Sequence, residues 1–189
     1  MEYSSLLEFM ALSEKLKCNT RHSWTTDGRK ESVAEHTYRL GIFAWLVKEE
    51  FQDLDMDRVM KMCLFHDIGE AVTGDVPSFL KGTAEEEKEA EALKKIIQNL
   101  PEPHQKELAD MIEEIEKNET REAKLVHALD KMEAVIQHNE APIHTWLPLE
   151  YELNQVYGES QAAVFEYTRE LRKVLKGQTI EKIKKADQQ

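Results

Sequence analysis

Apolar residues recur at three- and four-residue spacing along most of this chain, and this periodicity is the feature that most constrains its fold. Such spacing places apolar side chains on one face of an α-helix, whereas the alternation typical of half-buried strands is scarce. Only 7 Gly and 5 Pro interrupt the 189 residues. The sequence therefore predicts an all-α fold.

Capping residues and prolines predict where the individual helices begin and end. Ser32 and Glu35 form a capping-box pattern. Apolar or small residues follow it at helical spacing: Val33, Thr37, Leu40, Ala44, Val47 and Phe51. Further helices are expected over residues 55–74, 83–101, 103–117 and 120–136. The remainder of the chain is expected to form one or two more. No Gly/Ser/Pro-rich linker divides the chain, so we expect one domain over residues 1–189.

The charge balance limits the kinds of partner. Asp and Glu number 37 against 25 Lys and Arg, which gives a formal net charge of −12. A nucleic-acid polymer is a poor match, because binding to its backbone relies on clustered Lys and Arg. A small anionic substrate stays compatible with this charge, since one bound metal ion or one well-placed Arg supplies the positive centre.

The cysteines and the first residues bear on location. Cys18 and Cys63 form neither a CxxC pair nor a disulfide framework, which favours a reducing compartment. Residues 1–7 lack a basic start followed by a long apolar run, and no stretch approaches membrane-spanning length. We therefore expect a cytoplasmic protein with no membrane contact.

Three of the expected helices each point metal-compatible side chains inwards. His66 and Asp67 follow the apolar side chains of residues 59–63 at helical spacing, which places both on the inward side. His36 lies beside the apolar stripe of its own helix. Asp130 has apolar residues on its side and no cationic residue at i−4 or i+4. Because burying an unpaired carboxylate is costly, these side chains are expected to share a partner.

Two imidazoles and two carboxylates suit a borderline divalent cation. The two negative charges neutralise the ion and leave coordination positions for water and substrate. We expect one ion, and Mn, Fe, Co and Zn are all compatible with this ligand set. Taken singly, each residue also fits a hydrogen-bonded core histidine or an aspartate paired with a distant base, but the four together favour a metal site.

The order His36, His66, Asp67, Asp130 resembles the H…HD…D signature of the HD-domain phosphohydrolases. In that superfamily these four side chains hold the metal. The signature region spans about residues 31–135. The resemblance implies a helical bundle with the metal site between its core helices.

Three longer segments resemble the 5'-deoxynucleotidase branch of this superfamily: residues 31–37, 66–76 and 122–131. The middle segment is the most specific, and the resemblance covers roughly residues 5–140. It also implies a homodimer. Helices expected over residues 146–186 have apolar spacing that suits either packing on the core or the dimer contact.

The resemblance assigns roles to further residues. Glu70 is expected to orient the attacking water or accept its proton, and Asp75 to protonate the departing sugar oxygen. Arg21, in an expected polar loop, is to grip the phosphate, and Trp24 to disfavour a 2'-hydroxyl at the sugar. Glu70, Asp75 and Arg21 each also have a structural alternative: a surface glutamate, a turn aspartate and an exposed arginine. Two residues separate Arg21 from Trp24, whereas the bacterial pattern has the pair adjacent.

The expected function is metal-dependent hydrolysis of deoxyribonucleoside 5'-monophosphates, with a small nucleotide as substrate. One alternative is another HD enzyme, acting on nucleoside triphosphates or signalling nucleotides or as a di-iron oxygenase. Another is a non-catalytic, metal-stabilised interaction module. A second metal ion is not expected, because the middle region lacks the extra His pair of the two-metal branches. The remaining histidines are not needed by this scheme: His22, His104, His127, His138 and His144.

Overall fold

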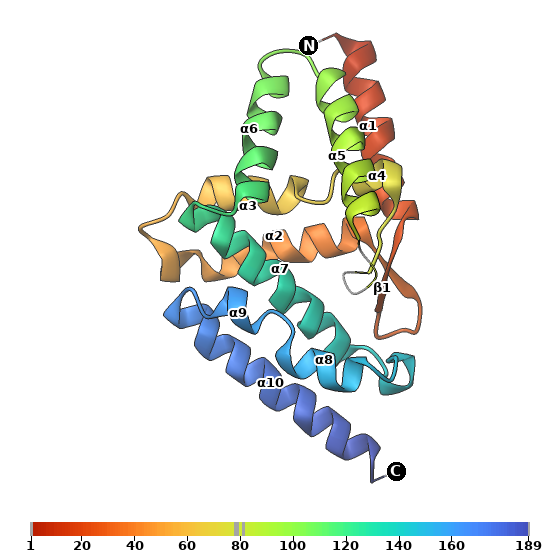
Figure 1. The fold of residues 1–189 in the computed structure, drawn as a ribbon, viewed down its shortest axis with the longest axis vertical. Helices are drawn as coiled ribbons and strands as arrows, with labels where there is room; N and C mark the ends of the chain where they lie inside the picture. Colours follow the sequence, from red (N-terminus) through yellow and green to blue (C-terminus); the bar gives the residue numbers. More distant parts are fainter. Residues whose placement is uncertain (1, 78–79, 81, 189) are drawn as a thin grey trace.

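The computed structural model describes residues 2–77, 80 and 82–188, and most of them are helical, which confirms the all-α prediction. Three helices form the middle of the molecule (Figure 1): α2 (Val33–Val47), α3 (Met56–Phe65) and α7 (Arg121–Glu140). The end that carries the N-terminus holds α1 (Tyr3–Cys18), α5 (Thr83–Gln98) and α6 (His104–Lys117). The opposite end holds α8 (Glu150–Val156), α9 (Glu159–Ala162) and α10 (Glu166–Ala186).

The three central helices begin where the capping residues predict. Ser32 Oγ accepts a hydrogen bond from the Glu35 backbone N–H at 3.2 Å, and the Glu35 carboxylate accepts one from the Ser32 N–H at 2.8 Å. The Asp55 side chain caps α3 by accepting from the Arg58 N–H, and the Thr120 side chain caps α7 by accepting from the Ala123 N–H. These side chains satisfy backbone N–H groups that have no partner within the first turn.

Two apolar clusters hold the bundle together. The larger one joins α2, α3 and α7, and residues of α9 and α10 pack onto its α7 side. The second joins α1, α5 and α6, and it includes Val33 and Ile68. His36 lies between Val33 and Leu40 in α2, and Asp67 lies between Cys63 and Ile68 in the turn after α3, so these polar residues mark the boundary between the clusters.

The expected helix over residues 55–74 is wrong in its second half. α3 ends at Phe65, residues 66–69 form a turn, and a short helix α4 (Glu70–Thr73) follows. Within the turn the backbone bonds span three residues, as from the Ile68 N–H to the Phe65 carbonyl at 3.1 Å. Gly69 packs against α5 so closely that a Cβ would lie 3.0 Å from Leu93 Cγ. Tertiary packing therefore overrides the helical periodicity here.

A small antiparallel hairpin was not expected. It pairs β1 (Thr20–Trp24) with β2 (Lys30–Ser32), so Arg21 and Trp24 lie on a strand and the prediction of a polar loop is wrong. The strands are short and mostly polar, so they carry no period-two apolar pattern. Thr20 pairs with Ser32 and Trp24 with Lys30, which leaves two extra residues in β1 as a bulge.

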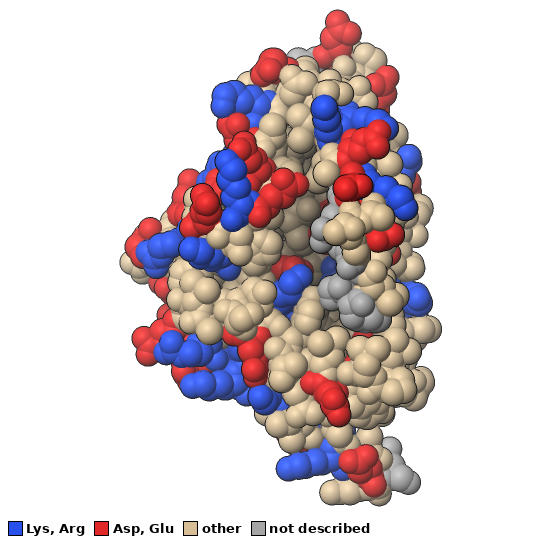
Figure 2. Space-filling view, in the orientation of Figure 1, with Lys and Arg blue, Asp and Glu red and all other residues tan. Residues whose placement is uncertain are grey.

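The remaining elements are short or peripheral. Single 3₁₀ turns, η1 (Lys48–Phe51) and η2 (Ile143–Thr145), follow α2 and α7. The structure contains three helices at the C-terminal end, where one or two were expected, and α9 and α10 pack against α7. The described residues contain no helix that is both long and apolar enough to span a bilayer. Acidic and basic side chains are interspersed on the face of the molecule that Figure 2 shows.

Candidate active site

Four of the predicted side chains meet at the boundary between the two apolar clusters. His36 comes from α2, His66 and Asp67 from the turn after α3, and Asp130 from α7. His36 Nε2 lies 3.1 Å from Asp130 Oδ1 and 3.9 Å from Asp67 Oδ2. His66 Nε2 lies 3.1 Å from Asp67 Oδ2 and 3.8 Å from Asp130 Oδ1. Residues from three separate elements thus direct two ring nitrogens and two carboxylates to one point.

The other ring nitrogen of each histidine is already engaged. His36 Nδ1 lies 2.5 Å from Glu133 Oε2, and His66 Nδ1 lies 3.0 Å from the Cys63 carbonyl oxygen. Both partners are acceptors, so Nδ1 carries a proton and donates it, which leaves Nε2 to face the carboxylates. This arrangement is the one that metal-binding histidines adopt.

Without a metal ion, a proton on an imidazole helps to balance the charge of the carboxylates. Burial lowers the pKa of His66, but the Asp67 and Asp130 carboxylates outweigh burial and raise it to about 10. Burial opposes ionisation of Asp67 too, yet His66 holds the pKa of that carboxyl well below its usual range. Two acceptor-only carboxylates and two imidazoles therefore require added positive charge in the interior.

The residues present fit a divalent metal ion. His66 Nε2 is buried and makes no well-aligned hydrogen bond within the described part of the chain, although Asp67 lies close to it. Two neutral imidazoles and two carboxylates are ligands that first-row transition metals accept, and such an ion would replace the protons held there.

Arg21 brings a permanent positive charge next to this cluster. Its Nη1 lies 3.6 Å from Asp67 Oδ2, and its Nε lies 3.4 Å from Glu31 Oε2. Burial lowers the pKa of Arg21, but the surrounding carboxylates, Asp67 first, outweigh burial and raise it above its usual value. Burial together with the charge of Glu133 raises the pKa of Glu31 to about 7, although Arg21 opposes this. The Arg21 guanidinium is therefore held by the Asp67 and Glu31 carboxyl groups and stays charged.

Glu70 and Asp75 are carboxyl groups with raised pKa values near the same point. Burial and the negative charge of Asp67 raise the pKa of Glu70 to about 9. Burial also raises the pKa of Asp75, while a hydrogen bond with the His22 backbone lowers it in part. Groups whose pKa values lie nearer neutrality than usual are suited to exchanging protons during a reaction.

One cavity joins these residues. Its wall includes β1, the turn after α3, the segment after α4, α7 and α8, and it is lined by Arg21, His22, Ser23, Asp67, Glu70, Asp75, Val76, Pro77, Asp130, Lys131, Ala134, His138, Glu150, Leu153, Asn154 and Tyr157. His36 and His66 lie behind Asp67 and Asp130. A permanent cation, a cluster suited to a metal ion and two carboxyl groups with raised pKa values therefore face one space.

Trp24 is not among the described residues that line this cavity. Its ring lies 6.0 Å from Lys30 Nζ across the hairpin, and its carbonyl oxygen accepts a hydrogen bond from Gln137 Nε2 at 2.6 Å. The structure therefore brings Arg21, Glu70 and Asp75 to the cluster and leaves the Trp24 ring outside the cavity.

Two residues of α7 belong to the site but were not predicted from the sequence. Glu133 holds His36, and Lys131 Nζ lies 3.0 Å from Asp130 Oδ2. Glu133 follows Asp130 by three residues, so it lies on the same helix face, and a buried acid at that spacing was a signal in the sequence. Lys131 offered no comparable signal, because a Lys on an amphipathic helix is usually solvated.

Comparison with known protein families agrees with this geometry. The family model described as HD domain matches residues 13–172. The human 5'-deoxynucleotidase HDDC2 is 38% identical over 140 residues, which cover 72% of this chain and 68% of the relative. The HDDC2 protein of Dictyostelium discoideum is 35% identical over 144 residues, which cover 71% and 76%. The resemblance inferred from the sequence is therefore confirmed.

Solved structures show the same fold. A predicted metal-dependent phosphohydrolase from Magnetospirillum magnetotacticum MS-1 superposes with a TM-score of 0.80 at 24% identity, over 95% of each chain. A conserved hypothetical protein from Pyrococcus furiosus gives a TM-score of 0.70 at 30% identity, over 91% of this chain and 98% of that protein. This chain belongs to the HD domain family and, within it, to the group that contains the 5'-deoxynucleotidase HDDC2 proteins.

Proposed function

We propose that this protein is a metal-dependent 5'-deoxynucleotidase, which hydrolyses deoxyribonucleoside 5'-monophosphates to deoxynucleoside and inorganic phosphate. The observation that carries the proposal is the shared cavity, where the Asp67 and Asp130 carboxylates, the Arg21 guanidinium and the carboxyl groups of Glu70 and Asp75 all face one space. The names of the HDDC2 relatives support the same substrate class.

His36, His66, Asp67 and Asp130 would hold one divalent metal ion, and Mn, Co, Fe and Zn all suit this ligand set. When bound, such an ion polarises a phosphoryl oxygen and makes water more acidic. Glu133 and the Cys63 carbonyl keep the two imidazoles in the orientation needed for this role.

Arg21 would bind the phosphate group of the substrate. Its guanidinium faces the cavity and presents several N–H donors in one plane, which match phosphate oxygens. The ion pairs with Asp67 and Glu31 fix the side chain before substrate arrives, so little side-chain entropy is lost on binding.

Glu70 and Asp75 would move the protons. As the water oxygen bonds to phosphorus and the bond from phosphorus to the sugar oxygen breaks, Glu70 accepts a proton from the water and Asp75 donates one to the sugar oxygen. Burial is the main cause that raises the pKa of Glu70, and the charge of Asp67 adds to it. A cation held by Asp67 would lower that pKa and make Glu70 a better proton acceptor. Exchange with solvent then restores both carboxyl groups.

Trp24 stays a candidate for deoxyribose selectivity through the family resemblance alone. Because its ring lies outside the cavity, we propose that any effect is transmitted through β1, which also carries Arg21. A W24A variant should then change the ratio of kcat/KM for dAMP and AMP without changing metal affinity. An unchanged ratio would remove Trp24 from the scheme.

We further propose a homodimer located in the cytoplasm. Exposed apolar side chains of α2 support a second copy as partner, since Tyr38, Ile42 and Trp45 share one face and are 67%, 40% and 55% exposed. Free Cys18 and Cys63 suit a reducing compartment. Light scattering should give twice the chain mass of 22.0 kDa, and W45E should give the single-chain mass.

The function is tested by phosphate release from chelator-stripped protein supplied in turn with Mn²⁺, Co²⁺ and Zn²⁺. The substrates are dAMP, AMP, dATP and a general phosphatase substrate, and D67A is the control. We expect metal-dependent release from dAMP well above that from AMP and dATP, and none from D67A. Release from dATP alone would favour a triphosphate hydrolase, and no release at all would favour a non-catalytic module.

A further inference from the structure

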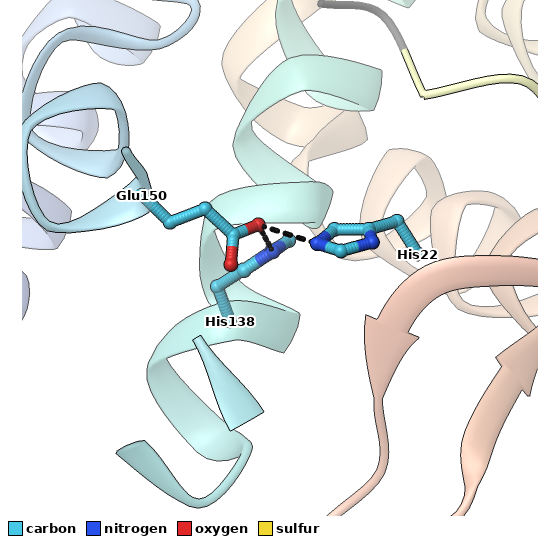
Figure 3. A group of neighbouring side chains, drawn as sticks. All are labelled: His22, His138 and Glu150. Carbon is cyan, nitrogen blue, oxygen red and sulfur yellow. Dashed lines mark hydrogen bonds and ion pairs between the residues drawn. The ribbon is translucent and has the colours of Figure 1, made fainter. Parts of the chain in front are cut away.

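Three side chains on the cavity wall form a second cluster of metal-compatible groups. His22 comes from β1, His138 from the last turns of α7, and Glu150 is the first residue of α8. Both imidazole rings face the Glu150 carboxylate (Figure 3). His138 Nε2 lies 2.7 Å from Glu150 Oε1, and His22 Nε2 lies 3.1 Å from the same oxygen. The proposed reaction uses none of the three.

The contacts around His138 and Glu150 fix how they face each other. His138 Nδ1 lies 2.9 Å from the Ala134 carbonyl oxygen, which only accepts, so in a neutral ring Nδ1 carries the proton. Nε2 then presents a lone pair to Glu150 Oε1. The other carboxylate oxygen, Oε2, accepts a hydrogen bond from the Leu147 backbone N–H at 2.7 Å. Two electron-rich atoms at 2.7 Å require a proton or a metal ion to join them.

The two imidazoles are also the groups that must balance the negative charge of Glu150. Its side chain is 3% exposed, and in the described part of the chain no Lys or Arg forms an ion pair with it. A buried carboxylate needs a compensating positive charge. His22 and His138 supply it only when one of them is protonated, whereas a divalent ion supplies it with both rings neutral.

We propose that His22, His138 and Glu150 bind a second divalent metal ion of the zinc class. Two imidazole nitrogens and one carboxylate oxygen, all three within 4.8 Å of one another, are a ligand set that zinc accepts, with a position left open for water or substrate. A tetrahedral ion about 2.1 Å from each ligand would separate neighbouring ligand atoms by about 3.4 Å. The two separations from Glu150 Oε1 to the imidazole nitrogens, 2.7 and 3.1 Å, are within about 1 Å of that value, a shift that side-chain rotation supplies.

This second site would join three parts of the cavity wall that have no covalent link near it. The ion would tie β1 and α7 to the start of α8, and His22 is the neighbour of Arg21. It shares no ligand with the His36, His66, Asp67 and Asp130 cluster, so its occupancy does not depend on the proposed reaction. The proposal departs from the expectation of a single metal ion, which was based on the sequence around the first site.

Cobalt binding to chelator-stripped, full-length protein tests the proposal. Isothermal titration should give two Co²⁺ per wild-type chain and one per chain for E150Q and for H22Q. E150Q is the sharper variant, because its amide can still accept from the Leu147 N–H and donate to His138 Nε2, so a cluster held only by hydrogen bonds stays intact. H144Q, which changes an exposed histidine of η2, is the matched control and should bind two Co²⁺ per chain.

A D67A background separates the two sites. D67A should bind one Co²⁺, and its visible absorption spectrum should show that imidazoles are among the ligands. D67A combined with E150Q should bind none. Circular dichroism confirms that each variant is folded. If E150Q and H22Q bind as many ions as the wild type, or if folded D67A binds none, the three side chains share a proton and the proposal is overturned. Neither result depends on phosphate release, so failure of the proposed function is seen separately.

Discussion

At the scale of single residues, the site depends on groups that hold other groups in place. His36 is fully buried, and its Nδ1 is hydrogen bonded to Glu133, so the orientation of the ring and of its Nε2 is fixed. Glu133 touches neither the cavity nor the proposed substrate, and it acts through His36 as a positioning residue. Such partners of metal-binding histidines typically contribute 10- to 100-fold to metal affinity.

An E133Q variant should therefore bind Co²⁺ at the first site about 10- to 100-fold more weakly, because an amide is a poorer acceptor for the His36 Nδ1–H. Calorimetric titration measures this. E140Q is the matched control: it lies on the same helix, is partly exposed and pairs with Arg39, so its affinity should equal that of the wild type. Equal losses in the two variants would contradict the role of Glu133.

Arg21 is the residue whose exchange should act on substrate rather than on metal. R21K keeps the charge but loses the planar pair of donors, and one charge-assisted hydrogen bond is worth about 1.5–3 kcal/mol. We expect kcat/KM for dAMP to fall by about 10- to 100-fold, mainly through KM. Steady-state kinetics measure this, with R169K, an exposed arginine on α10, as the control. An unchanged KM would show that Arg21 does not bind the phosphate.

At the scale of elements, the hairpin and α2 are joined by one ion pair at the capping box. Arg29 hydrogen bonds to both Glu35 carboxylate oxygens, at 2.6 and 2.9 Å, and the same carboxylate caps the helix. The hydrogen bond from Arg29 is the largest cause that lowers the pKa of Glu35 to about 2. The N-terminus of the helix that carries His36 is thus fastened to the hairpin that carries Arg21.

This pair should make stability depend on pH. Because the folded pKa of Glu35 lies below its ordinary value of 4.5, ionised Glu35 stabilises the folded chain above about pH 4.5, and the contribution is lost as pH falls towards about 2. After solvent screening we expect E35Q to lower the free energy of unfolding by about 0.5 kcal/mol at pH 7 and by progressively less below pH 4.5. Urea unfolding between pH 3 and 7 measures the difference. E119Q, which changes an exposed glutamate outside this ion pair, is the control variant.

At the scale of the whole molecule, a filled metal site would add a polar link between elements that already pack together through the larger apolar cluster. The four predicted ligands come from α2, the turn after α3 and α7, and they lie between the two apolar clusters. An ion that binds only the folded chain stabilises it by about 2.7 kcal/mol at a concentration of 100 Kd. The melting temperature reports on this connection.

Addition of Mn²⁺ to stripped protein should raise Tm by about 5–10 °C, since 1 kcal/mol corresponds to about 2–4 °C at this chain length. D67A should show a clearly smaller rise because it lacks one ligand of the first site. Differential scanning calorimetry measures both. A rise of equal size in D67A would place the stabilising ion elsewhere.

Much of the fold and part of the site were accessible from the sequence because local signals and tertiary packing agree there. The capping box at Ser32 and the cap at Thr120 act within one turn, so the pattern alone locates α2 and α7. The end of α3 was missed because contacts with α5 determine it. His22 and Glu150 were not linked to each other because 127 residues lie between them and no pattern along the chain connects them. The one-domain organisation stays a prediction.

The irregular pairing of β1 makes this strand sensitive to its length. Two extra residues let the neighbours Arg21 and His22 both reach the cavity, whereas a regular strand turns neighbours to opposite sides. Loss of one residue between Thr20 and Trp24 would re-phase the strand and rotate one of these side chains away. Insertions and deletions, which surface hairpins usually tolerate, would here act like active-site mutations.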